Sequence, residues 1–202
     1  MKKNNPFLKY KRLIKKEYSL CFDYLVQSKN FFYFILIAFF AFFLIGFFIQ
    51  PSEIFLEKLL AFIEELLNET KDLPYFQLIS FLFLNNLQVS FFGMVFGVFF
   101  GIFSLLLAFL NGYFLGVVSS IVVKEKGIGI LFGLLPHGIF ELPAVFISLG
   151  LGLKIGSFIL QKNKIKSFRT YFWSSLRVFF LIVLPLLLIA AIIEGSLIFF
   201  FK

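Results

Sequence analysis

Residues 136–143 read Pro-His-Gly-Ile-Phe-Glu-Leu-Pro, and the rest of the chain is organised around this octapeptide. It contains His137, the only histidine of the chain, together with the carboxylate of Glu141, and a proline stands at each end. The sequence around it is apolar. Charged and helix-breaking residues are costly inside hydrocarbon, so their presence here predicts a structural or functional role.

The composition predicts an integral membrane protein. Of the 202 residues, 60% are hydrophobic and 35 are phenylalanine, and the mean hydropathy is +0.98. A membrane-spanning helix needs about 20 predominantly apolar residues, and the apolar runs of this chain suffice for about five such helices. We therefore expect an all-α, polytopic transmembrane helical bundle in the cell membrane, surrounded by the lipid bilayer.

The formal net charge of +8 does not predict binding to nucleic acid. The basic residues form two blocks that flank apolar segments, an arrangement typical of topology signals and of contacts with anionic lipids.

Residues 1–30 are predicted to form a basic amphipathic segment, and residues 31–202 a single transmembrane domain. Apolar residues three or four positions apart share one helical face in the first segment, namely Tyr10, Leu13, Ile14, Tyr18, Cys21, Phe22 and Leu25. Such a helix is expected in the membrane interface, with its lysines near lipid phosphates. Eight Lys and Arg residues precede the first span, residues 31–49, and this charge places the amino terminus in the cytoplasm.

A second amphipathic helix is predicted after the first span, over residues 53–69. It is rich in glutamate, and Phe55, Leu59, Phe62 and Leu66 form an apolar stripe along it. The negative charge indicates the external side of the membrane. Because an acidic helix is poorly suited to anionic lipid, we expect it to pack on protein.

The stretch from Leu73 to Val123 carries no charge and is longer than two ordinary spans require. We interpret it as an interfacial or re-entrant helix over residues 75–84, a break at Asn85-Asn86, a span over residues 87–106 and a returning span to Val123. The hairpin between these spans is expected near residues 108–112. Glycines repeat at every fourth position, at Gly93, Gly97 and Gly101 and again at Gly112 and Gly116, a spacing that lets membrane helices pack closely.

The octapeptide is predicted to interrupt a helix. A half-span to Leu135 would be followed by a kink across Pro136–Pro143 and a second half from about Ala144. The basic block that follows is expected in the cytoplasm, and a last span over residues 178–201, kinked at Pro185, would leave the carboxyl terminus outside.

Three interpretations of the octapeptide remain open. In a helix, His137 and Glu141 share one face, Gly138 gives space beside the histidine, and Pro143 frees the carbonyl of Ile139. The polar side chains of Asn85, Asn86 and Asn111 would complete a polar centre with this pair. That centre either fastens the broken helix, or binds a proton, metal ion or small substrate as in a transporter, or belongs to an intramembrane metalloenzyme.

An enzyme is the weakest of these interpretations. Zinc hydrolysis usually needs three protein ligands, and His137 with Glu141 supplies only two. The sequence also contains no Ser-His-Asp arrangement, and we expect neither catalytic residues nor a cofactor.

Several of these motifs together resemble the stage II sporulation protein M (SpoIIM) family. The resemblance rests on Asn85-Asn86 with the glycine repeat, Asn111-Gly112 with Gly116, and the string Pro136–Ala144 followed by Gly150, Gly152 and Gly156. It covers roughly residues 78–200. It implies a polytopic helical protein with about five spans, which agrees with the number of spans predicted from the apolar runs.

The resemblance also implies a function. Sporulation members of the family belong to a membrane complex that acts on the cell wall during engulfment. In that complex the family member is a scaffold and not the wall-cutting enzyme. We therefore expect a non-enzymatic scaffold or subunit linked to cell-envelope or membrane remodelling, working as a homodimer or with other membrane proteins. The alternative is a transporter or channel that takes a proton or small ion at His137 and Glu141.

Overall fold

The computed structural model describes residues 6–49, 51–129 and 135–200, which are helical almost throughout. Its α-helices are α1 (Pro6–Phe48), α2 (Glu53–Lys71), α3 (Tyr75–Val95), α4 (Ile102–Lys126), α5 (Leu135–Gly156), α6 (Lys164–Val178) and α7 (Leu184–Phe200). Short turns complete the chain: η1 (Phe96–Val98), η3 (Ser157–Leu160) and the π turn η4 (Phe179–Val183), which joins α6 and α7 into one helix. Five of the helices in these ranges are long and apolar enough to cross a membrane. The expected all-α bundle with about five spans is thus confirmed.

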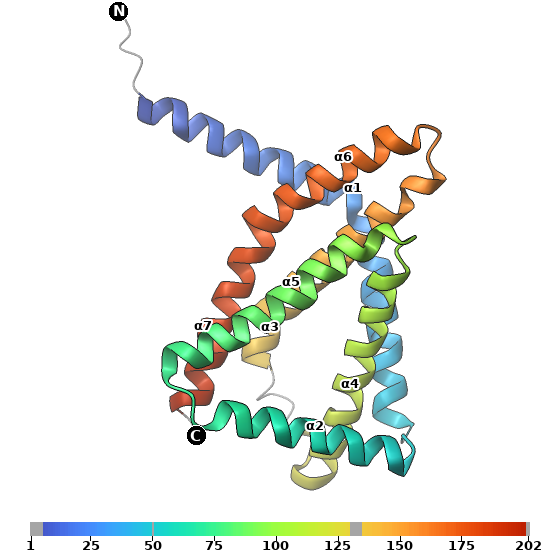
Figure 1. Ribbon diagram of the computed structural model, residues 1–202, viewed down its shortest axis with the longest axis vertical. Coiled ribbons are helices and arrows are strands. Elements are labelled where there is room, and N and C mark those ends of the chain that lie inside the picture. Colours follow the sequence, from blue (N-terminus) through green and yellow to red (C-terminus); the bar gives the residue numbers. More distant parts are fainter. Residues whose placement is uncertain (1–5, 50, 130–134, 201–202) are drawn as a thin grey trace, which may run out of the picture.

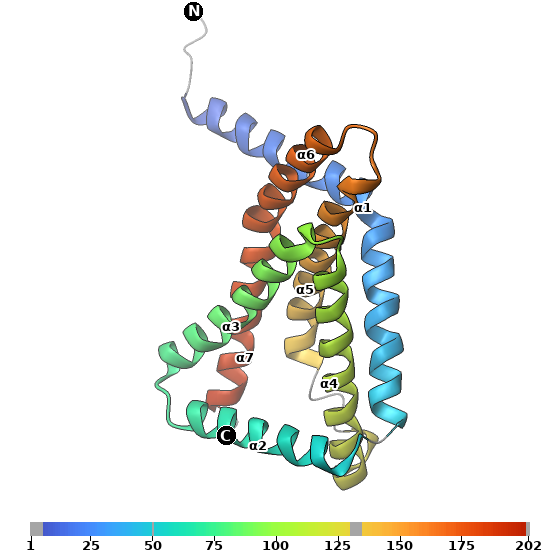
Figure 2. The same ribbon diagram turned by 45° about the vertical axis from the view of Figure 1, so that its right-hand side comes forward.

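Helix α1 contains both the amphipathic segment and the first span predicted from the sequence. Its first half leaves the bundle at a steep angle, whereas its second half runs alongside α4 (Figures 1 and 2). The hydroxyl of Ser28 donates to the carbonyl of Tyr24 at 2.6 Å, a bond that often bends helices. We refer to the part before Ser28 as the amphipathic half of α1.

The two ends of the bundle differ in charge. The amphipathic half of α1 and the connection from η3 to α6 lie at one end, which we name the basic end (Figure 1). Helix α2 lies across the opposite end, which we name the acidic end (Figures 1 and 2). The amino-terminal end of α3 and the carboxyl-terminal end of α7 meet there, where the hydroxyls of Tyr75 and Ser196 are 2.9 Å apart.

Helix α2 confirms the second amphipathic helix and makes limited contact with the rest of the bundle. The ring of Phe55 stacks on Phe114 and meets Tyr113 edge-on, and Leu59 is buried. Other apolar residues of this helix, including Ile54, Phe62 and Leu67, remain exposed. The helix therefore packs on protein through only part of its apolar surface.

Helix α5 is the centre of the bundle. Of its most apolar stretch 56% is buried, against 22–33% for the corresponding stretches of the other four spans. The main core cluster gathers residues from α1, α3, α5, α6 and α7 around it, among them Tyr24, Met94, Leu151 and Val178.

Glycines bring the backbones of neighbouring helices into direct contact. A Cβ atom added at Gly112 or Gly116 of α4 would collide with the backbone carbonyl oxygens of Phe39 and Phe43 in α1. At the other repeat, Gly97 faces the backbone of Gly152 in α5. Small residues at these positions permit the close van der Waals packing on which membrane helices depend.

Buried serines add hydrogen bonds between the same helices. The hydroxyl of Ser148 in α5 donates to the carbonyl of Ser90 in α3 at 2.6 Å, and that of Ser104 in α4 donates to the carbonyl of Gly93 at 2.8 Å. Each bond gives a buried hydroxyl a backbone acceptor on another helix.

The predicted division of residues 73–123 is wrong. Helix α3 continues from Tyr75 through Asn85 and Asn86 to Val95, and the hairpin lies at residues 99–101, not at 108–112. Phe100 and Gly101 both have positive φ angles, 58° and 73°, and this left-handed pair reverses the chain. A phenylalanine rarely adopts that conformation, and the sequence analysis assigned Gly101 to the helix-packing repeat and not to a turn.

The octapeptide lies in the first turns of α5, and helix α5 continues through Pro143. The helix after the predicted interruption therefore begins at Leu135 and not at Ala144. The half-span before it falls partly on residues 130–134, which lie outside the described residues, so the interruption itself stays a prediction. In the last span, the π turn η4 ends two residues before Pro185, which cannot donate a backbone hydrogen bond.

Candidate functional site

The described structure places His137 and Glu141 in one helix, four residues apart, although the sequence predicted a kink across this stretch. This spacing puts the two positions on one helical face. Glu141 is half-buried, and a Cβ atom at Gly138 would meet only the side chain of Leu142, at 3.5 Å. The side chain of His137 lies outside the described residues, so the proposed pair with Glu141 stays a prediction.

The three asparagines are distributed over two helices. Asn85 is exposed and Asn86 is half-buried within the continuous helix α3. Asn111 is exposed on α4, and its Nδ2 donates to the carbonyl of Leu107 in the same helix at 2.7 Å. Asn111 thus has a partner within its own helix, and the polar centre shared with the octapeptide also stays a prediction.

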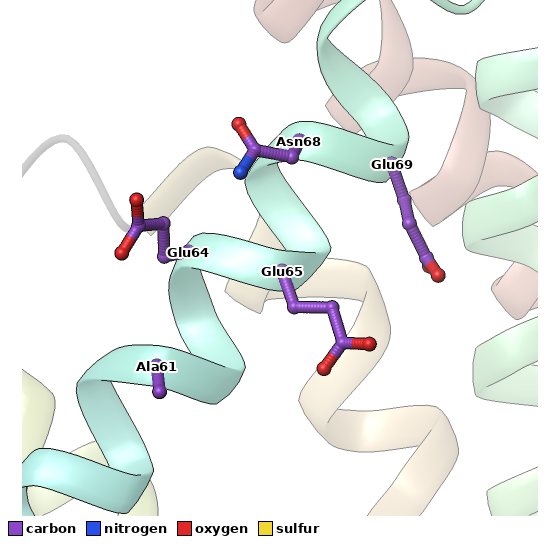
Figure 3. A pocket seen from close by; sticks show the side chains of 5 residues that line it. All are labelled: Ala61, Glu64, Glu65, Asn68 and Glu69. Carbon is purple, nitrogen blue, oxygen red and sulfur yellow. The ribbon is translucent and has the colours of Figure 1, made fainter.

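No group of three or more His, Cys, Asp or Glu residues in the described ranges is arranged to bind a metal ion. At the acidic end, Ala61, Glu64, Glu65, Asn68 and Glu69 line a surface hollow (Figure 3). Figure 3 shows that all five side chains belong to α2, so the hollow is open and has no opposing wall from another helix.

A polar cluster that was not predicted from the sequence lies at the basic end, where α1, α5 and α6 meet. Its centre is Lys154 near the end of α5, which is only 5% exposed. The ammonium of Lys154 donates to the hydroxyl of Ser28 at 2.8 Å and lies 3.8 Å from the ring centroid of Tyr24. The ring of Tyr171 in α6 is 5.5 Å away.

The same cluster joins α1 directly to α6. The hydroxyl of Tyr24 donates to the carbonyl of Tyr171 and lies within hydrogen-bonding distance of the Ser175 hydroxyl, both at 3.2 Å. About two turns earlier on α1, Glu17 forms a salt bridge of 2.8 Å with Arg177. We name Tyr24, Ser28, Lys154, Tyr171 and Ser175 the lysine cluster.

The chemistry of the lysine cluster suits the fastening of helices. A buried ammonium is costly unless hydrogen bonds and aromatic faces replace its water. The contacts described for Lys154 are with uncharged groups, a hydroxyl and two tyrosine rings, and they come from two other helices. The charge of Lys154 therefore favours one arrangement of α1, α5 and α6.

The sequence did contain a signal for Lys154. It was included in the basic block after α5, yet seven uncharged residues separate it from Lys162, the next lysine. It lies three residues after buried Leu151 and next to buried Ile155, so the helical period places it on a buried face.

These features define a class, the multi-pass helical membrane proteins whose spans pack through small residues. Comparison with known protein families matches residues 34–197 to the family described as stage II sporulation protein M. The chain belongs to this family, as the resemblance of its motifs implied. Comparisons with curated proteins and with solved structures gave no match.

Proposed function

We propose that this chain is a non-enzymatic scaffold, or a subunit of a membrane complex, that acts in remodelling of the cell envelope or membrane. Membership of the stage II sporulation protein M family supports a membrane protein of that family. It would work with a second copy of itself or with other membrane proteins, and the proposal assigns no residue a catalytic role.

The observation that carries the proposal is the environment of the buried side chain of Lys154. Transporters place intramembrane charges where a substrate or ion can reach them. The contacts of Lys154 instead connect α1, α5 and α6, and its side chain is almost completely enclosed. A rigid frame with amphipathic helices at both ends is what a scaffold requires.

The proposal includes an orientation. The basic end would face the cytoplasm and the acidic end the outside, because Lys and Arg are retained on the cytoplasmic side. The amino terminus would then be cytoplasmic and the carboxyl terminus external.

Ion flux in proteoliposomes separates a scaffold from a transporter that uses the octapeptide. For a scaffold, we expect the wild-type protein to leak protons and monovalent cations no faster than protein-free liposomes. We also expect His137→Ala to lower the thermal stability, because the scaffold proposal assigns His137 hydrogen bonds that fasten the helix and that alanine cannot form. Ser80→Ala is the control, since this hydroxyl is exposed and donates to the carbonyl of Phe76 within its own helix.

The opposite result would replace the proposal. Flux in the wild-type protein that disappears in a folded His137→Ala variant would make the chain a transporter or channel. Stoichiometric metal in the purified protein, measured by elemental analysis, would instead favour a metalloenzyme.

A further inference from the structure

The exposed face of α6 carries a combination of side chains that neither water nor hydrocarbon accommodates well. Ile165 is 86% exposed and Trp173 61% exposed, and Arg169 lies between them at a spacing of four residues. Lys166 is exposed on the same helical face, and Lys162 precedes the helix. We name Lys162, Ile165, Lys166, Arg169 and Trp173 the α6 stripe.

The opposite face of α6 is occupied by the bundle. Phe168, Tyr171 and Phe172 pack against the main core, and Ser175 and Val178 are buried. The α6 stripe is thus the outward surface of a helix whose other side is fixed.

The amphipathic half of α1 presents the same combination at the same end of the molecule. Tyr10, Ile14 and Phe22 are exposed among lysines and arginine, and Arg12, Lys15 and Lys16 line a shallow groove along this helix. The two helices cross in Figure 1 and are joined by the Tyr24 hydrogen bonds and by the Glu17–Arg177 salt bridge. They therefore present their basic and apolar side chains as one unit.

We propose that the α6 stripe binds anionic phospholipid headgroups of the leaflet at the basic end. Charge complementarity identifies this partner. The chain has no acidic residue between Glu141 and Glu194, so the stripe and its helix contribute only positive charge. Juxtamembrane Lys and Arg attract anionic lipids, while tryptophan and isoleucine enter the boundary between headgroups and acyl chains.

A position at the membrane interface explains why the α6 stripe contains both apolar and basic side chains. A stripe facing water would leave Ile165 and Trp173 hydrated without compensation, and a stripe facing acyl chains would leave Arg169 and Lys166 without polar partners. At the headgroup level, the rings and aliphatic groups leave water and the cations meet phosphates. This inference goes beyond the scaffold function and does not depend on it, because a transporter could bind the same lipids.

Trp173 is the only tryptophan of the chain, so its fluorescence reports on the α6 stripe alone. The full-length protein is reconstituted in mixed phosphatidylcholine and phosphatidylglycerol vesicles of one fixed composition. In one sample part of the phosphatidylglycerol carries bromine, which quenches tryptophan on contact. In the other sample the same fraction of total lipid is brominated phosphatidylcholine. Both leaflets have the same composition, so the orientation of insertion does not matter.

We expect brominated phosphatidylglycerol to quench Trp173 about two- to fivefold more than brominated phosphatidylcholine, in line with the attraction of a few basic residues for anionic lipid. The combined changes Lys162→Gln, Lys166→Gln and Arg169→Gln should bring this ratio close to equality. The matched control removes three exposed lysines at the acidic end, with Lys58→Gln, Lys124→Gln and Lys126→Gln, and should leave the ratio unchanged.

Three results would overturn the proposal. Equal quenching by the two lipids in the wild-type protein would show no preference for anionic headgroups. A ratio that survives the triple change in the stripe would place the attraction elsewhere. Absence of quenching by either lipid would show that a second copy or another protein covers Trp173. The wild-type comparison decides the first and third cases even if the triple variant does not fold.

Discussion

A single buried lysine has a large influence on how three helices of this protein are arranged. The ammonium of Lys154 loses nearly all its contact with water, and the hydroxyl of Ser28 and the tyrosine rings replace that contact. A hydrogen bond to a charged group and a desolvated cation–π contact contribute about 2 kcal/mol each, which offsets the cost of burial. The position is consequently sensitive to the shape of the side chain as well as to its charge.

Two replacements of Lys154 should separate the contribution of its shape from that of its charge. Lys154→Ala leaves a void between α1, α5 and α6 and should lower the free energy of unfolding by about 2–4 kcal/mol. Lys154→Met fills most of the space without a buried charge and should cost less than about 1.5 kcal/mol. Thermal or detergent-induced unfolding, followed by circular dichroism, measures both.

The control for this series is Lys162→Ala, at an exposed position, which should change the free energy of unfolding by no more than about 0.5 kcal/mol. Equal stability of Lys154→Ala and the wild type would refute the fastening role of Lys154.

At the residue scale, the sequence singled out His137, Glu141 and three asparagines as polar groups in apolar sequence, but it missed the buried Lys154 and its partners. His137 and Glu141 lie in one helix, where the sequence predicted a kink. The partners of Lys154 could not be predicted, because Tyr24, Ser28 and Tyr171 come from segments far apart in the sequence. Only the tertiary packing of α1, α5 and α6 brings them together.

At the scale of the helices, backbone contact between α1 and α4 is the main packing device. Gly46 of α1 faces the carbonyl oxygen of Tyr113, while Gly112 and Gly116 of α4 face carbonyls of α1, so small residues on both helices permit the approach. Backbone atoms cannot rotate away from an added methyl group. A substitution there must push the two helices apart.

Gly116→Ala is therefore expected to destabilise the protein by about 1–3 kcal/mol, the usual cost of overpacking. Its new Cβ would collide with the carbonyl oxygen of Phe43 and lie 2.9 Å from the amide nitrogen of Phe47. The midpoint of thermal unfolding in detergent measures the effect.

Gly129→Ala provides the comparison for that substitution, because an added Cβ there has no atom of the described residues within 4 Å. It should leave the midpoint almost unchanged. A midpoint for Gly116→Ala as high as that of Gly129→Ala would mean that the α1–α4 contact is looser than the structure describes.

The helices themselves were predictable where charge marks their ends, as for α1 and α2, and unpredictable where it does not. Between Leu73 and Val123 the only guides were glycines and asparagines, and both were misleading. Gly112 serves helix contact and not a turn, and Asn85 lies within α3. The actual turn uses Phe100 and Gly101, both with positive φ angles.

On the scale of the whole molecule, the separation of charge between the two ends predicts an orientation in the membrane. The amphipathic half of α1 and the start of α6 bring basic residues to one end, whereas α2 brings glutamates to the other (Figure 1). The helix order is consistent with this, because five spans leave the two termini on opposite sides. The positive charge should therefore keep the basic end in the cytoplasm.

Single cysteines test this orientation directly. In a Cys21→Ser background, which removes the only native thiol, Lys58→Cys reports on the acidic end and Lys166→Cys on the basic end; both native side chains are exposed. A membrane-impermeant maleimide added to intact cells should label the cysteine at position 58 and leave that at position 166 unlabelled. Permeabilised cells, in which both cysteines should react, are the control for accessibility. Labelling of position 166 in intact cells would show that the topology is the inverse of the predicted one. The α6 stripe would then lie at the external leaflet, where cytoplasmic retention of basic residues could not explain its positive charge.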